Sequence, residues 1–484
     1  MSKIHLTPGR SVTGDSNIRH PQGDILNVRG FYDQNSHVMP ENLSEISKVL
    51  VGDEESSWVE YVPPCYDGSH PVPLVISCHG GGQSGWGQAY ATSWMNVADR
   101  EGFIVVFPDA KTNKAWQVAG HRGGSVEIDP NTRDIQLMLR LIEEMAGKYN
   151  IDQGRVFMQG MSMGDLMTMQ FARAFGEKLA GAACAAGPTA IEGLFTEDEA
   201  LRPYSVPVPV FQSRGEHDAM AVSGGYDGKA TRYDINRADL QYWCTINGCE
   251  KAPQFRIDGK NNYLYFKGSK ADVIYRDVKN RGHGQTFDDA DVVWRQFFSG
   301  LARRDGQIVQ TETEEKAEGD AHAVLLAEGC THLVRNNQIV SLKDGVPYNE
   351  QDVFEMPEIP TAPGAEPPKF PKLEFDPCLY APVTFLEVFG ATVDFREETA
   401  LIHTADGHEI EVSAGNVGCV IDNYIHSMER QAEYKKGMLY VPVKWFAANV
   451  FGRFVTEHDG AVYISDHYGE MTNDMAKLIK EFLK

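Results

Sequence analysis

The chain has 484 residues, more than one hydrophobic core usually spans, so two or three domains are expected. Its formal net charge of −23 argues against a nucleic-acid partner and against binding to an anionic membrane surface. No apolar run approaches the ~20 residues that cross a bilayer, and the first residues lack the apolar segment of a secretory signal. We therefore expect a cytoplasmic location, with secretion as the alternative if a leader has been removed.

The eight cysteines show no closely spaced pairs of the kind that bind zinc. In a reducing compartment they are expected to be thiols, most of them buried. Cys244 and Cys249 are near enough in sequence to form a disulfide in an exported protein. The sequence therefore predicts neither a metal site nor a cofactor.

The segment from about residue 58 to residue 301 alternates between strand-like apolar runs and helix-like amphipathic patterns. Such alternation is typical of the α/β class, in which helices cover both faces of a mostly parallel sheet. We predict a domain over 51–305, preceded by a polar, weakly patterned extension over 1–50. The expected strands are 59–62, 74–78, 103–107, 156–159, 181–186, 208–211 and 273–278, and the expected helices are 131–149, the segment after residue 164, and 288–301.

A run of glycines follows the first convincing core strand. The apolar residues 74–78 lead into His79 and then Gly80, Gly81 and Gly82. A glycine-rich loop in this position is typical of sites that turn backbone N–H groups toward a developing oxyanion. The alternative is a flexible turn, but the place directly after a core strand favours the oxyanion loop.

The most informative motif is Gly-Met-Ser-Met-Gly at 160–164, which follows an apolar strand and precedes a helical pattern. This is the strand–turn–helix context of the G-x-S-x-G nucleophile elbow. The glycines allow a tight turn with no Cβ in the way, so the Ser162 hydroxyl should stand above the carboxyl edge of the sheet. The backbone N–H of Met163 is expected to be an oxyanion donor, together with Gly80 and Gly81.

A serine hydroxyl needs a base to take its proton and a third group to orient that base. The strand-like run at 208–211 leads into a polar loop that carries Glu216 and Asp218. A carboxylate on the loop that leaves a late strand suits the orienting role. We predict Asp218 in this role, with Glu216 as the competitor.

The base is expected on the loop after the next strand-like run, 273–278. His283 stands there between two glycines, which suit a loop that projects an imidazole. With Ser162 and Asp218 it completes the chain order serine, acid, histidine. His121 precedes the serine and is a weaker candidate.

Four ring side chains near these motifs are candidates for substrate binding. Trp86 and Trp116 either line an apolar pocket or belong to the core. His217 stands beside the predicted acid and either lines the site or is solvated. His79 opens the glycine loop.

Two breaks separate this domain from the tail. The segment 311–320 is charged and poor in apolar residues, and the segment 355–377 is rich in proline. The first is typical of a linker and the second of an extended, semi-rigid strap. We therefore predict a linker and strap over 306–377.

The tail contains an internal repeat. Leu-Tyr-Ala-Pro-Val at 379–383 recurs as Leu-Tyr-Val-Pro-Val at 439–443, and both copies continue into short β-like runs. Each copy predicts a strand end, a proline, an amphipathic helix, a glycine and a hairpin. The sequence thus predicts a smaller α+β domain over 378–484. It shows no catalytic cluster, so we consider a cover over the catalytic cleft and a homodimer contact as its roles.

The first part of the chain resembles the poly(3-hydroxybutyrate) depolymerase and feruloyl esterase branch of the α/β-hydrolases, which includes acetyl xylan esterases. The resemblance implies an α/β-hydrolase fold, with Ser162, Asp218 and His283 as the catalytic triad. The family commonly has Gly-Gly after the elbow serine, whereas here Gly164 is followed by Asp165. The resemblance is carried by residues 74–84, 98–109, 148–152, 160–164 and 282–284.

The tail resembles the copper amine oxidase N-terminal-like module, which does not imply copper. Taken together, the sequence predicts a serine carboxylic-ester hydrolase that acts through an acyl-enzyme on small or oligomeric esters, phenolic (feruloyl-like) or short-acyl. A hydroxybutyrate oligomer hydrolase and a serine peptidase of the same fold are alternatives. The alternative outside enzymes is a scaffold or binding protein with a relic hydrolase domain.

Overall fold

The computed structural model describes residues 17–19, 25–27, 42–110, 114–120, 124–220, 224–351, 353–354 and 372–484. The chain divides into two compact units. The first comprises Met1–Pro253, Tyr265–Arg276 and Asn280–Ala317, and the second comprises Gln254–Leu264, Asp277–Lys279 and Glu318–Lys484. Within the described ranges, no helix is long and apolar enough to span a membrane. Most of the predicted extension over 1–50, and His121, lie outside the described residues.

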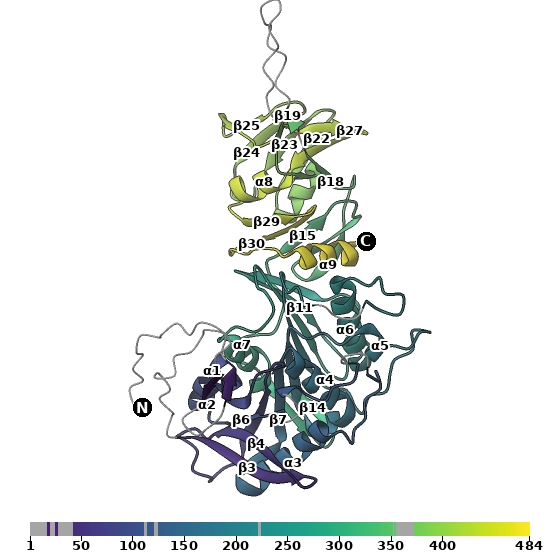
Figure 1. Ribbon diagram of the computed structural model, residues 1–484. Helices are drawn as coiled ribbons and strands as arrows, with labels where there is room; N and C mark the ends of the chain where they lie inside the picture. The colour runs from purple at the N-terminus through teal and green to yellow at the C-terminus, as the bar shows by residue number, and fades with distance from the viewer. Residues whose placement is uncertain are drawn as a thin grey trace, which may run out of the picture. The chain divides into compact units, whose positions relative to one another are not determined.

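A large, mostly parallel sheet forms the centre of the first unit (Figure 1). Its central strands β6, β5, β7, β8 and β9 are parallel neighbours, and β3 and β4 add an antiparallel edge. The strand order in this unit is β12 (Val273–Val278), β9 (Val210–Gly215), β8 (Gly181–Ala185), β7 (Ile151–Met161), β5 (Val72–Cys78), β6 (Ile104–Pro108), β4 (Glu54–Tyr61) and β3 (Leu43–Val51).

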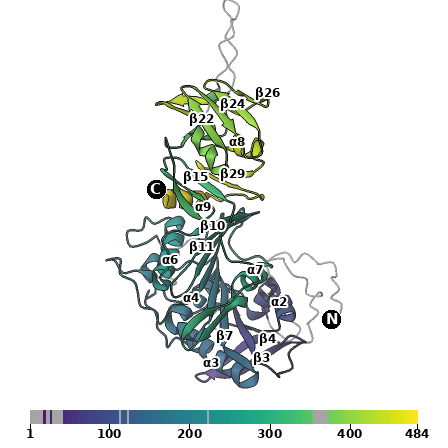
Figure 2. The ribbon, with the colours of Figure 1, turned by 180° about the vertical axis from the view of Figure 1, so that it is seen from behind.

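The inner strands are buried on both faces, which explains their continuous apolar runs. Every residue of β5, β6, β8 and β9 is buried. In both views α2 and α7 lie on one side of the sheet and α4 and α6 on the other, and Figure 1 shows α1 beside α2 (Figures 1 and 2). The predicted α/β class is therefore confirmed. The helices are α1 (Gly85–Ala91), α2 (Trp94–Glu101), α3 (Arg133–Lys148), α4 (Met163–Phe175), α5 (Ile191–Leu194), α6 (Arg232–Asn247) and α7 (Asp289–Gln296).

Helix α6 was not predicted from the sequence. Its inner face buries polar residues, Asn236 and Asp239, so the apolar spacing that marks a helix is interrupted. The ends are nevertheless well defined: Thr231 and Asp234 form a capping box, and Gly248 ends the helix in the left-handed conformation. The remaining short elements of this unit are β1 (Asn17–Arg19), β2 (Ile25–Asn27), η3 (Gly176–Lys178), η4 (Phe298–Gly300), β13 (Leu301–Arg304) and β14 (Gln307–Gln310).

The second unit has an internal two-fold arrangement around the strand pair β21 (Cys378–Pro382) and β28 (Met438–Pro442). Ala381 lies opposite Val441 at the centre of this antiparallel pair. On either side, Tyr380 pairs with Pro442, and Pro382 pairs with Tyr440. These residues occupy equivalent places in the predicted repeat. The two copies therefore pair with each other through their equivalent strands, β21 and β28.

Each copy continues into a five-stranded antiparallel sheet. After β21 the chain forms η5, a 3-10 helix where an amphipathic helix was predicted, and after β28 it forms the helix α8. One sheet has the order β22-β23-β24-β25-β26 and the other β29-β30-β15-β16-β17. The bounds are η5 (Val383–Phe389), α8 (Val443–Asn449), β22 (Thr392–Arg396), β23 (Thr399–His403), β24 (Glu409–Ser413), β25 (Gly418–Ile421), β26 (Tyr424–Ser427), β29 (Phe454–His458), β30 (Ala461–Ser465), β15 (Val324–Ala327), β16 (His332–Arg335) and β17 (Gln338–Ser341).

The second copy is thus completed by strands that precede the first copy in the chain. The turn β16–β17 has two positive-φ residues, Asn336 and Asn337, and the equivalent turn β25–β26 has Asp422 and Asn423. Tight hairpins of this kind need φ > 0 at both central positions. The other elements of the unit are β10 (Gln254–Asp258), β11 (Asn261–Phe266), β18 (Tyr348–Glu350), β19 (Val353–Phe354), β20 (Leu373–Glu374), β27 (Glu433–Lys435) and α9 (Asn473–Leu483).

Part of the predicted linker over 306–377 therefore has a different structure. Residues 324–350 form β15 to β18. Strand β15 pairs with β30, which comes much later in the chain. These strands have only three or four residues each, so the local pattern is weak, and β15 and β18 also pair with strands distant in sequence, β30 and β21. The adjacent asparagines at 336 and 337 are the sequence signal for the hairpin between β16 and β17.

Leu439 provides a test of the shared core. It is fully buried in one cluster with Val324, Ile402 and Trp445. We expect Leu439→Ala to lower the free energy of unfolding by about 2–5 kcal/mol, because it removes buried methyl groups and leaves a cavity. Urea denaturation followed by tryptophan fluorescence measures this change. Ile425→Ala, at a side chain that is 83% exposed, is the control and should change stability by less than about 0.5 kcal/mol. Equal effects would contradict the arrangement.

Candidate active site

Ser162 lies at the sharp turn between β7 and α4. Its backbone has φ 55° and ψ −115°, a conformation that non-glycine residues rarely adopt. The Ser162 N–H donates to Ala185 O on β8 (2.8 Å), and Ser162 O accepts from Leu166 N–H in α4 (3.1 Å). The strained residue is thus held from both sides, as expected for strain at a functional position.

Three glycines make this turn possible by close backbone approach. A Cβ on Gly160 would lie 2.0 Å from Gly164 O, and one on Gly164 would lie 2.2 Å from Cys78 O. A Cβ on Gly187 would lie 2.2 Å from Ser162 O itself. These separations are far inside van der Waals contact, so no larger residue fits without moving the backbone.

The three side chains predicted as a triad form one hydrogen-bonded chain. Ser162 Oγ lies 2.9 Å from His283 Nε2, and His283 Nδ1 lies 3.0 Å from Asp218 Oδ1. Ser162, Asp218 and His283 come from the loops after β7, β9 and β12 respectively. In this arrangement the imidazole can accept the serine proton while the carboxylate orients the ring.

Asp218 is suited to remain ionised. Burial acts to raise its pKa, but the hydrogen bonds from His283 and from Met220 N–H (3.0 Å) outweigh burial and lower the pKa below its ordinary value. The competitor Glu216 instead accepts a hydrogen bond from Asn280 N–H at 3.0 Å. It therefore ties the acid loop to the histidine loop, while the two ring nitrogens of His283 face Asp218 and Ser162.

The glycine loop meets the elbow as predicted, but its donors are not equivalent. The Gly80 N–H already donates to Gln83 Oε1 at 3.0 Å. Among the described residues, no hydrogen bond engages the N–H of Gly81 or of Met163. The Met163 side chain also faces the loop, because a Cβ on Gly81 would lie 2.7 Å from its Sδ. Gly81 and Met163 are thus the better placed donors for an oxyanion.

His79 and Trp116 are buried and support the glycine loop through hydrogen bonds. His79 Nδ1 lies 2.6 Å from Gly80 O, and its Nε2 lies 3.0 Å from the Ala110 N–H, so Nε2 accepts and Nδ1 donates. Burial lowers the pKa of His79 to about 4, which keeps the ring neutral. Trp116 Nε1–H donates to His79 O at 2.7 Å.

The predicted roles of these rings in substrate binding therefore need revision. His79, Trp86 and Trp116 are buried, so their side chains belong to the core beneath the site. Trp86 stacks on Tyr90 with ring centroids 5.9 Å apart. His217 is different: its side chain is 59% exposed, and its backbone N–H donates to Arg281 O at 2.8 Å.

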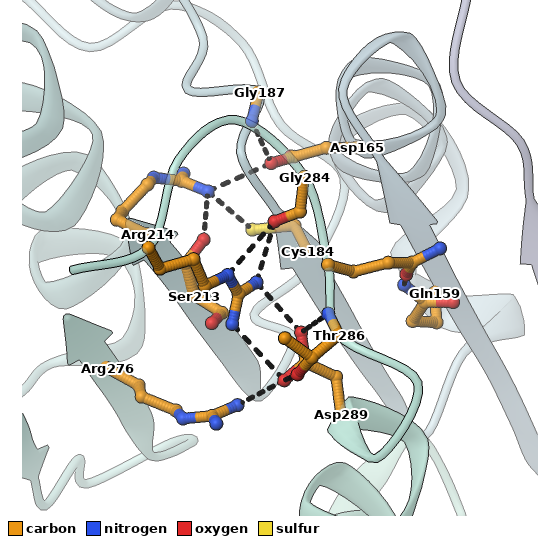
Figure 3. A network of polar contacts seen from close by, with 12 residues as sticks. Gln159, Asp165, Cys184, Gly187, Ser213, Arg214, Arg276, Gly284, Thr286 and Asp289 are labelled. Atoms are coloured by element: carbon orange, nitrogen blue, oxygen red, sulfur yellow. Dashed lines mark hydrogen bonds and ion pairs between the residues drawn. The ribbon is translucent and has the colours of Figure 1, made fainter. Parts of the chain in front are cut away.

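Asp165, the departure from the family pattern, has a buried cationic partner. Its Oδ2 accepts from Arg214 Nη1 (2.9 Å) and from Gly187 N–H (2.8 Å), as Figure 3 shows. Arg214 also donates to Asp239 Oδ2 (2.9 Å). Burial raises the pKa of Asp165 to about 7 and that of Asp239 to about 6, although Arg214 opposes both shifts. The sequence offered no signal for this triplet beyond the unusual Asp165.

The elbow and the acid loop lie within one match to a protein family. A family model described as Phospholipase/Carboxylesterase matches residues 67–225, a range that contains Ser162 and Asp218. With its mostly parallel sheet and helices on both faces, the first unit has the α/β-hydrolase fold predicted from the sequence. The resemblance of the tail to a copper amine oxidase N-terminal-like module stays a prediction.

Curated proteins similar to the first unit include an acetylxylan esterase/xylanase, a feruloyl esterase and a poly(3-hydroxyalkanoate) depolymerase. A bifunctional acetylxylan esterase/xylanase of Neocallimastix patriciarum is 29% identical over 226 residues, 46% of this chain and 30% of that protein. A feruloyl esterase B of Piromyces equi is 26% identical over 48% of this chain and 43% of that protein. A poly(3-hydroxyalkanoate) depolymerase C of Paucimonas lemoignei is 28% identical over 24% of this chain and 28% of that protein. The chain spans less than half the length of these relatives.

Solved structures similar to this chain include two esterases. An acetyl xylan esterase from Aspergillus awamori is 16% identical, with a TM-score of 0.38, and the match covers 52% of this chain and 97% of that chain. A ferulic acid esterase from Anaeromyces mucronatus is 17% identical, with a TM-score of 0.35 over 52% of this chain and 92% of that chain.

Gly187 offers a test of the elbow around Ser162. We expect Gly187→Ala to reduce the rate of Ser162 labelling by a fluorophosphonate about 100-fold, because the new Cβ displaces the Ser162 backbone and a misplacement near 1 Å has an effect of this size. Gly147→Ala, where nothing lies within 4 Å of the added Cβ, is the matched control and should label at the wild-type rate. Equal labelling in both variants would contradict the close approach.

The lowered pKa of Asp218 predicts an acid-dependent loss of stability. Its ionised form stabilises the fold at pH values above the ordinary aspartate pKa of about 3.9, and this contribution is lost as the pH falls through the lower folded-state pKa. We expect Asp218→Asn to flatten the decline of the unfolding free energy between about pH 5 and pH 3. Urea denaturation at a series of pH values measures the slope. Identical slopes in the variant and the wild type would rule the prediction out.

Proposed function

We propose that this protein is a serine carboxylic-ester hydrolase that acts through an acyl-enzyme, with Ser162, His283 and Asp218 as its triad. The observation that carries the proposal is the hydrogen-bonded chain from Ser162 Oγ to His283 and on to Asp218, which begins at a strained elbow. The names of the curated relatives, acetylxylan esterase and feruloyl esterase, support the same class of reaction.

The proposed ester hydrolysis uses Ser162, His283 and Asp218 in the following steps. Ser162 Oγ attacks the ester carbonyl while its proton passes to His283 Nε2, 2.9 Å away. Asp218 stabilises the imidazolium formed, and the N–H groups of Gly81 and Met163 receive the oxyanion of the tetrahedral intermediate. The C–O bond to the alcohol then breaks, and the proton on His283 leaves with the alcohol. Water repeats the sequence on the acyl-enzyme and releases the carboxylic acid and the free serine.

Short acyl groups on small or oligomeric esters are the substrates that fit best. An aromatic pocket built from Trp86 and Trp116 would have favoured a phenolic acyl group, but both side chains are buried in the core. The half-buried side chains of Met161 and Met163 flank the serine instead. Methionine forms an adaptable apolar surface that accepts acyl groups of different shapes. A feruloyl group therefore rests on the names of relatives alone.

A panel of esters tests the function and names the acyl group. It contains p-nitrophenyl acetate, p-nitrophenyl butyrate, methyl ferulate, an acetylated xylo-oligosaccharide and a hydroxybutyrate oligomer, with a chromogenic peptide as the arm for a peptidase. We expect turnover of the acetyl esters and a loss of about 10⁴–10⁶-fold in kcat for Ser162→Ala.

The controls separate the alternatives. Preference for methyl ferulate or for the hydroxybutyrate oligomer would move the substrate class to phenolic or hydroxyacyl esters and leave the mechanism in place. Cleavage of the peptide alone would replace the esterase by a peptidase. Absence of both turnover and fluorophosphonate labelling in the wild type would overturn the proposal in favour of a binding protein with a relic hydrolase domain.

A further inference from the structure

The loop that carries His283 is closed by the side chain of the residue two positions before it. Arg281 donates to the carbonyl of Gly284 through Nε (3.1 Å) and Nη2 (2.8 Å). The guanidinium therefore spans His283 and fixes the peptide that follows Gly284. Gly284 has φ +132°, which only glycine adopts without strain, so the turn is set for this closure.

The guanidinium of Arg281 is itself held by a buried carboxylate at the start of α7. Arg281 Nη1 lies 3.2 Å from Asp289 Oδ1, and Nη2 lies 2.8 Å from Asp289 Oδ2. The side chains of Arg281 and Asp289 are only 7% and 8% exposed. A bidentate pair of this kind has a fixed geometry as well as a favourable energy. Figure 3 shows the contacts that meet at Asp289 and at Gly284.

Asp289 has further partners, so its own position is determined independently of Arg281. Thr286 Oγ1 donates to Asp289 Oδ1 at 2.8 Å, and Thr286 N–H donates to Oδ2 at 3.2 Å. Arg276 Nη1 donates to Asp289 Oδ1 at 2.7 Å. Arg276 belongs to β12 and not to the loop that carries His283.

The loop is anchored on its other side by Gln285. Gln285 accepts from Gln159 Nε2 at 2.9 Å and donates to Gln88 Oε1 at 3.0 Å. Gln159 is the residue before Gly160 of the elbow, and its Oε1 accepts from Ser77 Oγ at 2.8 Å. The strand that presents Ser162 and the loop that presents His283 are therefore joined through side-chain amides.

We propose that Arg281, oriented by Asp289, is a positioning residue that holds the imidazole of His283 at hydrogen-bond distance from Ser162. This inference rests on the proposed function. Arg281 also contributes its carbonyl, which accepts from His217 N–H on the acid loop at 2.8 Å. The same residue thus ties the base loop to the acid loop through its backbone and closes the base loop through its side chain.

The removal of the guanidinium should act on the chemical step and not on substrate binding. Arg281 contacts the backbone beyond His283, and its side chain is buried away from any substrate. If the His283 loop relaxes, the distance from Nε2 to Ser162 Oγ is no longer fixed, and proton transfer slows. A loss that affects kcat with KM unchanged is the signature of an interaction needed only in the transition state.

Arg276 gives a matched control, because it binds the same carboxylate oxygen and is equally buried, at 4% exposure. We would compare Arg281→Gln, Arg276→Gln and Arg281→Lys in the full chain. The readouts are kcat and KM on p-nitrophenyl acetate, the rate of fluorophosphonate labelling, and Tm, with kinetics run well below the lowest Tm. Both glutamine variants should lose similar thermal stability, since each breaks a buried ion pair.

We expect Arg281→Gln to lower kcat and the labelling rate about 10- to 100-fold with KM within about twofold. Arg276→Gln should keep wild-type kcat. Arg281→Lys should recover part of the loss, because an ammonium can still reach one acceptor. Equal kcat in Arg281→Gln and Arg276→Gln, whether lowered or unchanged, would overturn the positioning role while the wild type remains an esterase. A wild type without turnover or labelling would overturn the proposed function, and this inference with it.

Discussion

The site depends on one steric constraint, the contact of backbone with backbone around Ser162. Gly160, Gly164 and Gly187 let strand β7, helix α4 and the loop after β8 approach within distances that a Cβ would forbid. The strained backbone of Ser162 persists because its neighbours over-determine it. The hydroxyl is therefore delivered to a fixed point, and the acid loop, the histidine loop and the glycine loop can be placed relative to that point.

Local features of the sequence were sufficient to predict this constraint and the loops around it. An apolar strand, a G-x-S-x-G turn and a glycine run are adjacent along the chain, so their pattern can be recognised without a structure. The strands predicted at 74–78 and 181–186 correspond to β5 and β8, which are buried, mostly apolar runs. The strand predicted at 273–278 corresponds to β12, whose first three residues are apolar. The rings of Trp86 and Trp116 could not be assigned, since an aromatic residue near a motif can face a pocket or the core.

Interactions between residues distant in sequence could not be predicted from the sequence. Arg214 joins Asp165 and Asp239, and Asp289 joins Arg276 and Arg281. The first triplet has one more acid than base and the second has one more base than acid. A small cavity is lined by residues of both regions, among them Cys184, Ser213, Arg276 and Asp289. Within each triplet, ion pairs and hydrogen bonds offset the cost of burying the charges.

The split repeat of the second unit has a consequence for how the chain acquires its structure. Val324 of β15 pairs with Ile464 of β30, so the ribosome makes one strand long before the other. Until β30 emerges, β15 to β17 have an unpaired edge, and edges of this kind invite wrong pairing. Contacts between such distant residues also slow folding, because a long loop must close before they form. The first copy, whose strands β21 to β26 are continuous in the chain, can form earlier and serve as the template on which the second copy is completed.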